Sequence, residues 1–163
     1  MSKVVYSGSF DPITLGHLDV VRRALKVFDE VVIAIGINGK KSPMFSPAQR
    51  IELWQQAIDD DSTLRVEKDR ITIGQTTGLI AEYAQASKAD ALIRGVRSPS
   101  EFEAETTMAL LNRQLTGLET VLLVADPNLG HISSSAVKEI VAFGGDITGM
   151  VPPAVAHALA KLP

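Results

Sequence analysis

Short runs of apolar residues, separated by segments of helical periodicity, constrain the fold of this chain more than any other feature. Such runs, each too short for a helix, occur at Val4–Tyr6, Val31–Ile35, Ala91–Ile93 and Val121–Val124. Each run is typical of a strand that is buried on both faces. Because strands of this kind alternate with helices, the pattern predicts an α/β fold, a doubly wound parallel sheet with helices on both faces.

The segments between these strands carry the markers of amphipathic helices. Apolar residues recur at helical spacing at Leu18, Val21, Leu25 and Phe28, and again at Ile51, Trp54 and Ile58. Residues 46–49 and 100–103 each predict a helix start, because a serine is followed three residues later by glutamine or glutamate. The pair Phe143-Gly144 predicts the end of a helix over 136–142, and Pro152-Pro153 predicts a last helix that ends near Lys161.

The middle of the chain is patterned less clearly. Residues 64–68 alternate between apolar and polar side chains, which predicts a fifth strand nearer an edge of the sheet. Residues 69–78 are the least patterned stretch. They are interpreted either as a surface loop or as part of the wall of a substrate pocket.

Composition limits the classes of protein to which the chain can belong. A chain of 163 residues with 45% hydrophobic and 21% charged residues predicts one globular domain over 1–163. The absence of cysteine excludes a disulfide framework and a thiolate site, and favours a reducing, cytoplasmic location. No apolar stretch approaches the roughly 18 residues of a membrane span, and no signal peptide is visible. A net charge of −3 argues against a nucleic-acid partner, so any anion must be held by local basic groups.

The loops that follow the strands are where a ligand is expected, because doubly wound sheets bind ligands at the carboxyl ends of their strands. The loop 7–17 leads from the first strand directly into the first helix. Gly8 permits close approach of the backbone to a ligand, and the helix start offers free N–H groups to a phosphate. Residues 36–42 imitate the end of a phosphate-binding P-loop, but their glycine spacing is wrong for one.

Two motifs in these loops resemble a known superfamily. Thr14-Leu15-Gly16-His17, preceded by residues 8–12, resembles the T-x-G-H signature of the nucleotidylyltransferases. Residues 132–138, Ile-Ser-Ser-Ser-Ala-Val-Lys, are similar to the second signature of that superfamily, which holds the nucleotide triphosphate. Within it, residues 6–12, 41–45, 92–97 and 108–113 resemble the bacterial phosphopantetheine adenylyltransferase family, and the resemblance spans nearly the whole chain.

The resemblance implies both a fold and a reaction. The fold is a Rossmann-like nucleotidyltransferase domain with a five-stranded parallel sheet. The reaction is the reversible transfer of an adenylyl group from ATP to 4′-phosphopantetheine, which gives dephospho-coenzyme A and pyrophosphate by in-line attack without a covalent intermediate. This is the penultimate step of coenzyme A biosynthesis. The resemblance also implies Mg²⁺ that arrives with ATP, a homohexamer, and coenzyme A as a feedback inhibitor.

The site residues follow from the resemblance, together with the need to neutralise two anionic substrates in one closed site. His17 is expected to stabilise the transition state, and Ser9 to bridge the phosphates of the two substrates. The implied catalytic residues are His17, Lys41, Arg94 and Ser9. The implied phosphopantetheine-binding residues are Ser9, Lys41, Ile80 and Arg94. The implied ATP-binding residues are Ser9, Phe10, His17, Gly95, Val96, Arg97, Glu105, Leu129, Gly130, His131, Ile132, Ser133, Ser134 and Ser135.

Several positions depart from the family's pattern, and the stretch before Leu79-Ile80 is longer than in the family, which leaves the wall of the pantetheine pocket open at this point. Ser9 replaces a threonine and keeps its hydroxyl, whereas Ser7 and Leu15 replace a usual proline and asparagine. Ala104 stands where tyrosine is common, so an aromatic contact to the nucleotide or to a regulatory ligand is missing, which puts feedback by coenzyme A in question.

Two alternative functions remain at this point. One is a nucleotidylyltransferase that acts on nicotinamide mononucleotide or a small phosphorylated alcohol. The Arg-Gly-Val-Arg of residues 94–97 and the Ser-Pro-Met-Phe of 42–45 argue against it. The other is a nucleotide sensor without turnover, against which the joint presence of His17, Lys41 and Arg94 speaks.

Overall fold

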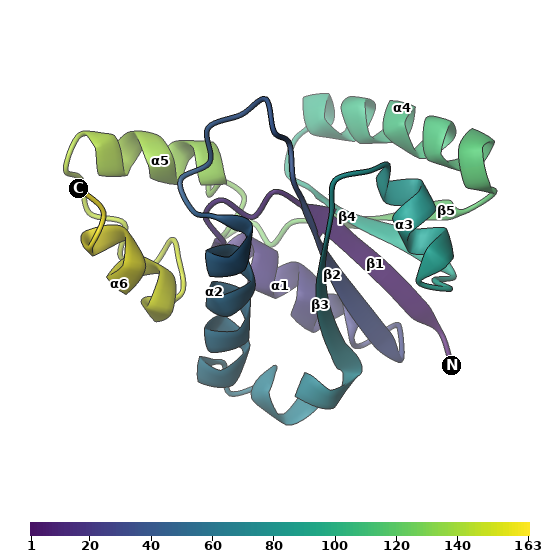
Figure 1. The fold of residues 1–163 in the computed structure, drawn as a ribbon, viewed down its shortest axis with the longest axis horizontal. Helices are drawn as coiled ribbons and strands as arrows, with labels where there is room; N and C mark the ends of the chain where they lie inside the picture. Colours follow the sequence, from purple (N-terminus) through teal and green to yellow (C-terminus); the bar gives the residue numbers. More distant parts are fainter.

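The chain folds around one sheet of five strands, all parallel (Figure 1). The computed structural model describes all residues, 1–163. The strands are β1 (Lys3–Gly8), β2 (Glu30–Gly36), β3 (Ile71–Thr76), β4 (Ala91–Val96) and β5 (Glu119–Val124), in the spatial order β3-β2-β1-β4-β5. The predicted doubly wound parallel sheet is confirmed, and the four apolar runs lie in β1, β2, β4 and β5. The run in β5 is not buried on both faces as expected, because β5 is an edge strand with a neighbour on one side only and is partly exposed.

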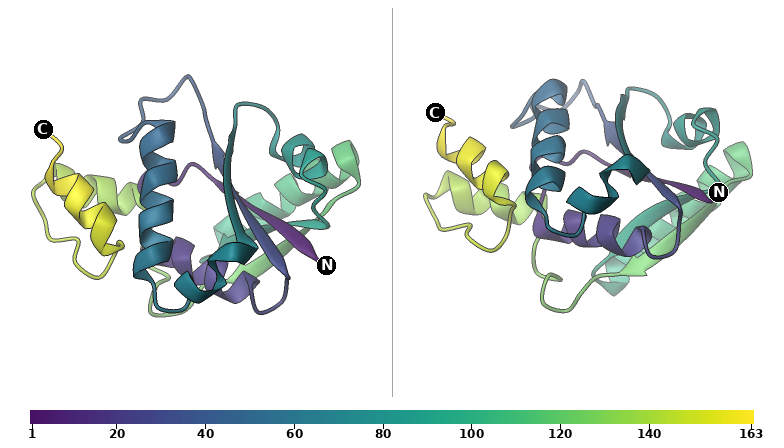
Figure 2. Two further views of the ribbon diagram at one scale, coloured as in Figure 1. Left: turned by 60° about the horizontal axis from the view of Figure 1, so that its bottom comes forward. Right: turned by 90° about the horizontal axis from the view of Figure 1, so that it is seen from below.

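Helices cover both faces of this sheet. The helices are α1 (Leu15–Ala24), α2 (Pro47–Asp60), α3 (Ile80–Ala86), α4 (Pro99–Thr116), α5 (Ser134–Ala142) and α6 (Pro153–Ala160). One face carries α1 and α2, and the other carries α3 and α4 (Figure 1). Helices α5 and α6 lie side by side at the end of the molecule away from the N-terminus, where α6 contacts α2 (Figure 2). None of these helices combines the length and the apolar character that crossing a membrane requires.

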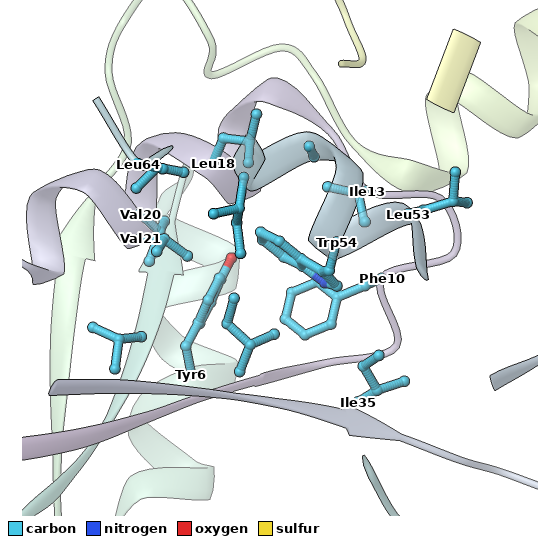
Figure 3. Close-up of a cluster of buried hydrophobic side chains, with 14 of the residues drawn as sticks. Tyr6, Phe10, Ile13, Leu18, Val20, Val21, Ile35, Leu53, Trp54 and Leu64 are labelled. Carbon is cyan, nitrogen blue, oxygen red and sulfur yellow. The ribbon is translucent and has the colours of Figure 1, made fainter. Parts of the chain in front are cut away.

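The two faces of the sheet bury very different amounts of apolar surface. Alternate residues of β1 point to opposite faces, so Val4 and Tyr6 join the cluster under α1 and α2 while Val5 joins the cluster under α3. The first cluster has 24 buried residues and the second has 6. Figure 3 shows the rings of Tyr6, Phe10 and Trp54 pointing toward one another within the larger cluster. The face with α1 and α2 therefore supplies most of the hydrophobic stabilisation.

Two local predictions were wrong, and the first concerns the edge of the sheet. Residues 64–68 do not form a strand, because Asp61 Oδ1 accepts hydrogen bonds from the N–H groups of Thr63 (3.0 Å) and Leu64 (2.9 Å) and starts a turn there. A 3₁₀ helix, η1 (Arg65–Arg70), follows, and its Arg70 donates to the carbonyls of Leu25 and Phe28 beyond the end of α1. The strand at this edge of the sheet is β3, which lies in the stretch interpreted as a loop or pocket wall, and β5 forms the other edge.

The second wrong prediction concerns the start of α4. The N-cap is Ser98 and not Ser100, since the Ser98 hydroxyl accepts the N–H of Glu101 at 3.3 Å. Pro99 then occupies the first helical position, where a missing N–H costs nothing. The other predicted boundaries are confirmed: Ser46 and Gln49 form a reciprocal capping box, and α5 and α6 end within a residue or two of the expected positions.

The order of the strands creates a crevice between β1 and β4. After β1 the chain turns to β2 and β3, and after β3 it crosses back to β4 on the other side of β1. Helix α1 leaves β1 along one face of the sheet and α4 leaves β4 along the other. The loops that follow these neighbouring strands therefore diverge, which opens a space at their carboxyl ends.

Candidate active site

A cavity of about 330 Å³ opens at the carboxyl ends of β1 and β4. Its walls come from β1 and the loop after it, the start of α1, the end of β4, one face of α4 and the start of α5. The site residues implied by the resemblance that line it are Ser9, Phe10, His17, Arg94, Gly95, Arg97, Glu105, Leu129, Ile132, Ser133, Ser134 and Ser135. The structure thus brings together residues from four separate segments of the chain.

The loop after β1 forms the floor of this cavity in a tightly held conformation. The ring of Phe10 folds back under Gly8, where a Cβ atom would come within 3.0 Å of it. Phe10 is buried and has a φ of +48°, a left-handed backbone conformation that residues other than glycine rarely adopt. A cis peptide bond joins Asp11 and Pro12. Buried Asp11 accepts the N–H groups of Met44 and Phe45, both at 2.8 Å, which ties this loop to the loop before α2.

His17 is oriented by the first turn of α1. The N–H of Thr14 donates to Nδ1 of His17 at 2.9 Å, and the two residues form a capping box. Because Nδ1 accepts this hydrogen bond, the neutral ring carries its proton on Nε2. Burial lowers the pKa of His17 to about 3, with further contributions from the positive charges of Arg94 and Arg97. The imidazole is therefore a neutral hydrogen-bond donor at physiological pH.

Two arginines at the end of β4 line the cavity, and each is paired with a carboxylate of α4. Arg94 donates to Glu105 through Nε (3.0 Å) and Nη2 (2.8 Å), and through Nη1 to the carbonyl oxygen of Ser7. Burial disfavours the charge of Arg94, but the hydrogen bonds and charge of Glu105 outweigh it and raise the pKa of Arg94. Arg97 pairs with Glu101 and donates to the carbonyl oxygen of Ile132 at 2.6 Å. The pairs hold both guanidinium groups at the cavity wall.

The start of α5 forms another wall of the cavity. The Ser133 hydroxyl caps the helix by accepting the N–H of Ala136 at 3.0 Å. Ser134 donates its hydroxyl proton to the carbonyl oxygen of Pro12 at 2.8 Å, which joins this helix to the loop after β1. Lys138 forms an ion pair with Asp11 at 3.1 Å. The first turn of α5 therefore directs N–H groups and the positive end of its dipole toward the cavity.

A second, smaller cavity of about 210 Å³ adjoins the first under α4. Ser7, Arg94 and Glu105 line both cavities, so the ion pair of Arg94 with Glu105 lies in their common wall. The remaining walls are mostly apolar and include Ile80, the first residue of α3. The second cavity is smaller than the first, and the cation Arg94 lies in the wall where the two cavities meet.

Four of the residues implied by the resemblance line neither cavity. Lys41 is exposed on the loop 37–46, and His131 is exposed on the loop before α5. Val96 is buried in the core, and half-buried Gly130 also lies outside the two cavities.

The structure also places at the site polar residues that sequence reasoning passed over. Asn112, inside the quoted motif 108–113, and Thr120 of β5 line the second cavity, and the Thr120 hydroxyl has no hydrogen-bond partner. Asp19 and Asp126 line the first cavity. The only sequence signal for Asn112 was its motif; Thr120, Asp19 and Asp126 follow no pattern that distinguishes them from surface residues. No cluster of three or more His, Asp and Glu side chains suited to a metal ion is present.

Comparisons with known proteins agree with this geometry. The Cytidylyltransferase-like family profile matches residues 5–140. The solved structure of a Plasmodium falciparum nicotinic acid mononucleotide adenylyltransferase superposes with a TM-score of 0.70 at 16% identity, covering 99% of this chain and 96% of that one. A putative nicotinate-nucleotide adenylyltransferase from Vibrio parahaemolyticus gives 0.65 at 18% identity, covering 99% and 100%. These structural likenesses establish the common fold.

Sequence relatives are closer. A curated protein of Kocuria rhizophila named phosphopantetheine adenylyltransferase is 47% identical, over 98% of this chain and 98% of its own length. One of the same name from Bifidobacterium longum is 45% identical, over 99% of this chain and 96% of its own. Since similarity at this level covers almost the whole length of both chains, this chain belongs to the phosphopantetheine adenylyltransferase family.

Proposed function

We propose that this chain transfers the adenylyl group of ATP to 4′-phosphopantetheine, forming dephospho-coenzyme A and pyrophosphate in the penultimate step of coenzyme A biosynthesis. The observation that carries the proposal is a pair of adjoining cavities with Arg94 in their common wall. A reaction that joins two phosphate-bearing molecules needs two such spaces and a cation where their phosphates meet. Family membership supports the same reaction.

The chemical step needs no covalent intermediate with the protein. A phosphate oxygen of phosphopantetheine attacks the α-phosphorus of ATP, a new P–O bond forms, and the bond to the bridging oxygen of the β-phosphate breaks. Pyrophosphate then leaves with the electrons of that bond. Negative charge grows on the oxygens around the α-phosphorus, where fixed donors stabilise it. In this proposal Nε2–H of His17 is the principal donor, because Thr14 holds the ring in the required tautomer.

The remaining residues bind and orient the two substrates. Ser9 lies on the floor of the nucleotide cavity, where its hydroxyl bridges the two reacting phosphates. The N–H groups and hydroxyls at the start of α5 bind the β- and γ-phosphates, and Ile80 contacts the pantetheine arm in the second cavity. The adenosine lies along the nucleotide cavity, in contact with those of the other residues assigned to ATP that line it, which are Phe10, Gly95, Arg97, Glu105, Leu129 and Ile132. Lys41 is exposed outside the cavities, so it serves the reaction only if its loop moves toward the phosphates when they bind.

Magnesium enters this scheme as part of the substrate. ATP carries the ion into the site, and the triphosphate supplies its ligands together with water. The carboxylates beside the arginines are engaged in ion pairs, as in Glu101 with Arg97 and Glu105 with Arg94. We propose that residues 1–163 act as one domain in the cytoplasm.

The exposed apolar side chains of helix α4 are an observation in favour of self-association of the chain. Five of its apolar side chains are about half exposed: Phe102, Met108, Leu110, Leu111 and Leu115. Apolar side chains gathered on one helix are typical of a surface that a protein partner covers. We propose that copies of this chain cover it within a homohexamer, so light scattering should give six times the chain mass of 17.5 kDa.

Pyrophosphate release from Mg·ATP tests the reaction directly. Purified protein is assayed with 4′-phosphopantetheine, nicotinamide mononucleotide or glycerol 3-phosphate as the acceptor. Release with phosphopantetheine alone supports the proposal, and mass spectrometry should then detect dephospho-coenzyme A. Release with either of the other acceptors alone contradicts the proposed substrate. Tight ATP binding without release from any acceptor would indicate a nucleotide sensor.

A further inference from the structure

Arg50, in the first turns of α2, is a buried arginine without a carboxylate partner. It is 3% exposed and takes part in none of the ion pairs of the protein. Its Nη1 donates to the carbonyl oxygen of Ser9 at 2.8 Å and, more weakly, to that of Gly36 at 3.4 Å, while its Nε has no partner. Burying an uncompensated cation costs stability, and the positive end of the α2 dipole adds to the cost. Stability alone does not explain this residue.

The hydrogen bond to Ser9 fixes the orientation of one peptide group. The peptide between Ser9 and Phe10 is trans, so its carbonyl and its N–H lie on opposite edges of one plane. Ser9 and Phe10 line the nucleotide cavity and Arg50 does not. With the carbonyl directed to Arg50, the N–H of Phe10 is directed away from Arg50. This N–H has no backbone acceptor in the protein.

Helix α2 holds the same loop at a second point. Trp54 lies one turn beyond Arg50, and its ring meets the Phe10 ring edge-on with centroids 5.1 Å apart (Figure 3). The left-handed backbone of Phe10 is strained, and a conformation of this kind persists only where its surroundings enforce it. Arg50 enforces it at the peptide and Trp54 at the ring.

We propose that Arg50 is a positioning residue that presents the N–H of Phe10 as a fixed donor to the phosphate chain of the bound nucleotide. This inference rests on the proposed adenylyl transfer. Arg50 itself does not touch the substrate; it acts through the peptide that it orients. The donor is in place before the nucleotide arrives, so it stabilises developing charge without reorganisation.

Kinetics of two Arg50 variants and a matched control test the role. Arg50→Met keeps the bulk of the side chain and removes the donor, so kcat should fall roughly 10- to 100-fold. This fall is at most about as large as the fall in kcat when one oxyanion-hole donor is removed. The KM for ATP should stay within about threefold, because the donor acts mainly in the transition state. Arg50→Lys can still donate to the Ser9 carbonyl and should recover most of kcat. Arg70→Met removes another arginine that donates to backbone carbonyls, away from the cavity, and should lower thermal stability without changing kcat.

Three results would overturn the proposal. An unchanged kcat in folded Arg50→Met would show that the peptide needs no such support. A raised KM for ATP with unchanged kcat would show that the charge of Arg50 attracts the nucleotide instead. An Arg50→Lys variant as slow as Arg50→Met would show that donation to Ser9 is not what matters.

The NMR signal of the Phe10 amide provides a second test, which does not depend on which acceptor substrate the enzyme uses. The chain has five phenylalanines, so ¹⁵N-phenylalanine labelling gives five backbone amide signals, and Phe10→Leu identifies the one from Phe10. Mg·ATP should shift this signal in the wild type but not in Arg50→Met, with the exposed Phe143 signal unchanged in both. If no acceptor supports turnover but this pattern holds, the proposed function fails and the role of Arg50 stands. If the Phe10 signal does not respond to Mg·ATP in the wild type, the role of Arg50 is wrong.

Discussion

Replacing His17 separates two roles that this side chain combines. Its Nδ1 accepts the N–H of Thr14 at 2.9 Å and so caps α1, while Nε2–H is the donor assigned to the reaction. Asparagine can place an acceptor near the position of Nδ1 but has nothing at Nε2. Alanine has neither group. Glutamine can return an N–H near the position of Nε2. The three variants therefore distinguish a loss of the cap from a loss of the donor.

The structure sets the expected magnitudes. Loss of one preorganised donor lowers kcat by roughly 10²- to 10³-fold, so His17→Asn and His17→Ala should both fall in this range. Loss of the capping contact costs about 0.5–2 kcal/mol of unfolding free energy, which should appear in His17→Ala and not in His17→Asn. His17→Gln should be intermediate in kcat. The dissociation constant of ATP should change little in all three, because the donor acts at the transition state.

The assay combines pyrophosphate release at saturating substrates, ATP binding by calorimetry and urea unfolding. The decisive comparison is between His17→Asn and His17→Ala. If His17→Asn keeps kcat within tenfold of the wild type, a smaller loss than removal of an oxyanion donor causes, His17 acts as a helix cap and the mechanism loses its principal donor. If its kcat falls with that of His17→Ala while its stability does not, the assignment holds.

Three further predictions concern the same cavity. Because burial, with Arg94 and Arg97, lowers the pKa of His17 in the free protein to about 3 from 6.5, the profile of kcat/KM against pH should show no ionisation of His17 between about pH 5 and 8. The unfolded chain binds the extra proton first, so stability should fall as pH drops from 6.5 toward 3, and His17→Asn should lose this dependence in urea unfolding. Arg94→Ala should raise the KM for phosphopantetheine roughly tenfold or more, and the KM for ATP much less. The control Arg113→Ala, at an exposed arginine, should change neither KM. An equal rise in both KM values for Arg94→Ala would contradict the assignment of Arg94 to phosphopantetheine. Ala104 lines the nucleotide cavity, so Ala104→Tyr should strengthen inhibition by coenzyme A about 2- to 10-fold through a new aromatic contact, and an unchanged inhibition constant would show that the contact is not there.

Strands buried on both faces were the most predictable part of this fold. The runs in β1, β2 and β4 consist of apolar residues that are buried on both faces, which leaves few other structures for them. The run in β5 is equally apolar, although this edge strand is only partly buried. The start of α2 was equally plain, because Ser46 and Gln49 satisfy each other's N–H groups within one turn. Both signals are local, so they are visible without knowledge of the tertiary structure.

The edge strand β3 escaped prediction for a tertiary reason. It is only half buried, and its Gly74 leaves room for the hydroxyl of Tyr83, with which a Cβ atom would collide. A glycine in mid-strand weakens the sequence pattern, while the packing of α3 against that glycine makes the strand fit. The alternation at 64–68 was misleading, since Val66 is 75% exposed and Asp61 sets the turn.

The residues of the candidate site likewise differ in whether local sequence or tertiary structure determines their place. Residues within short motifs, such as Thr14 to His17 and Ser133 to Ser135, were predictable because their spacing carries the chemistry. Arg50 was not, because nothing near it in sequence shows that it reaches Ser9, 41 residues away. The pairing of Arg94 with Glu105 likewise depends on how α4 lies against β4.

The paired arginines at the cavity have a consequence for selectivity among anions. Arg94 already bonds Glu105, and Arg97 already bonds Glu101, before any ligand enters. A free inorganic phosphate ion would have to displace a carboxylate and would gain little more binding energy than it disrupts, so these arginines should bind free phosphate weakly. A nucleotide can displace the same carboxylates more favourably, because contacts of its base and sugar add to the binding energy. The enzyme thus keeps its cations positioned without leaving them available to every phosphate in solution.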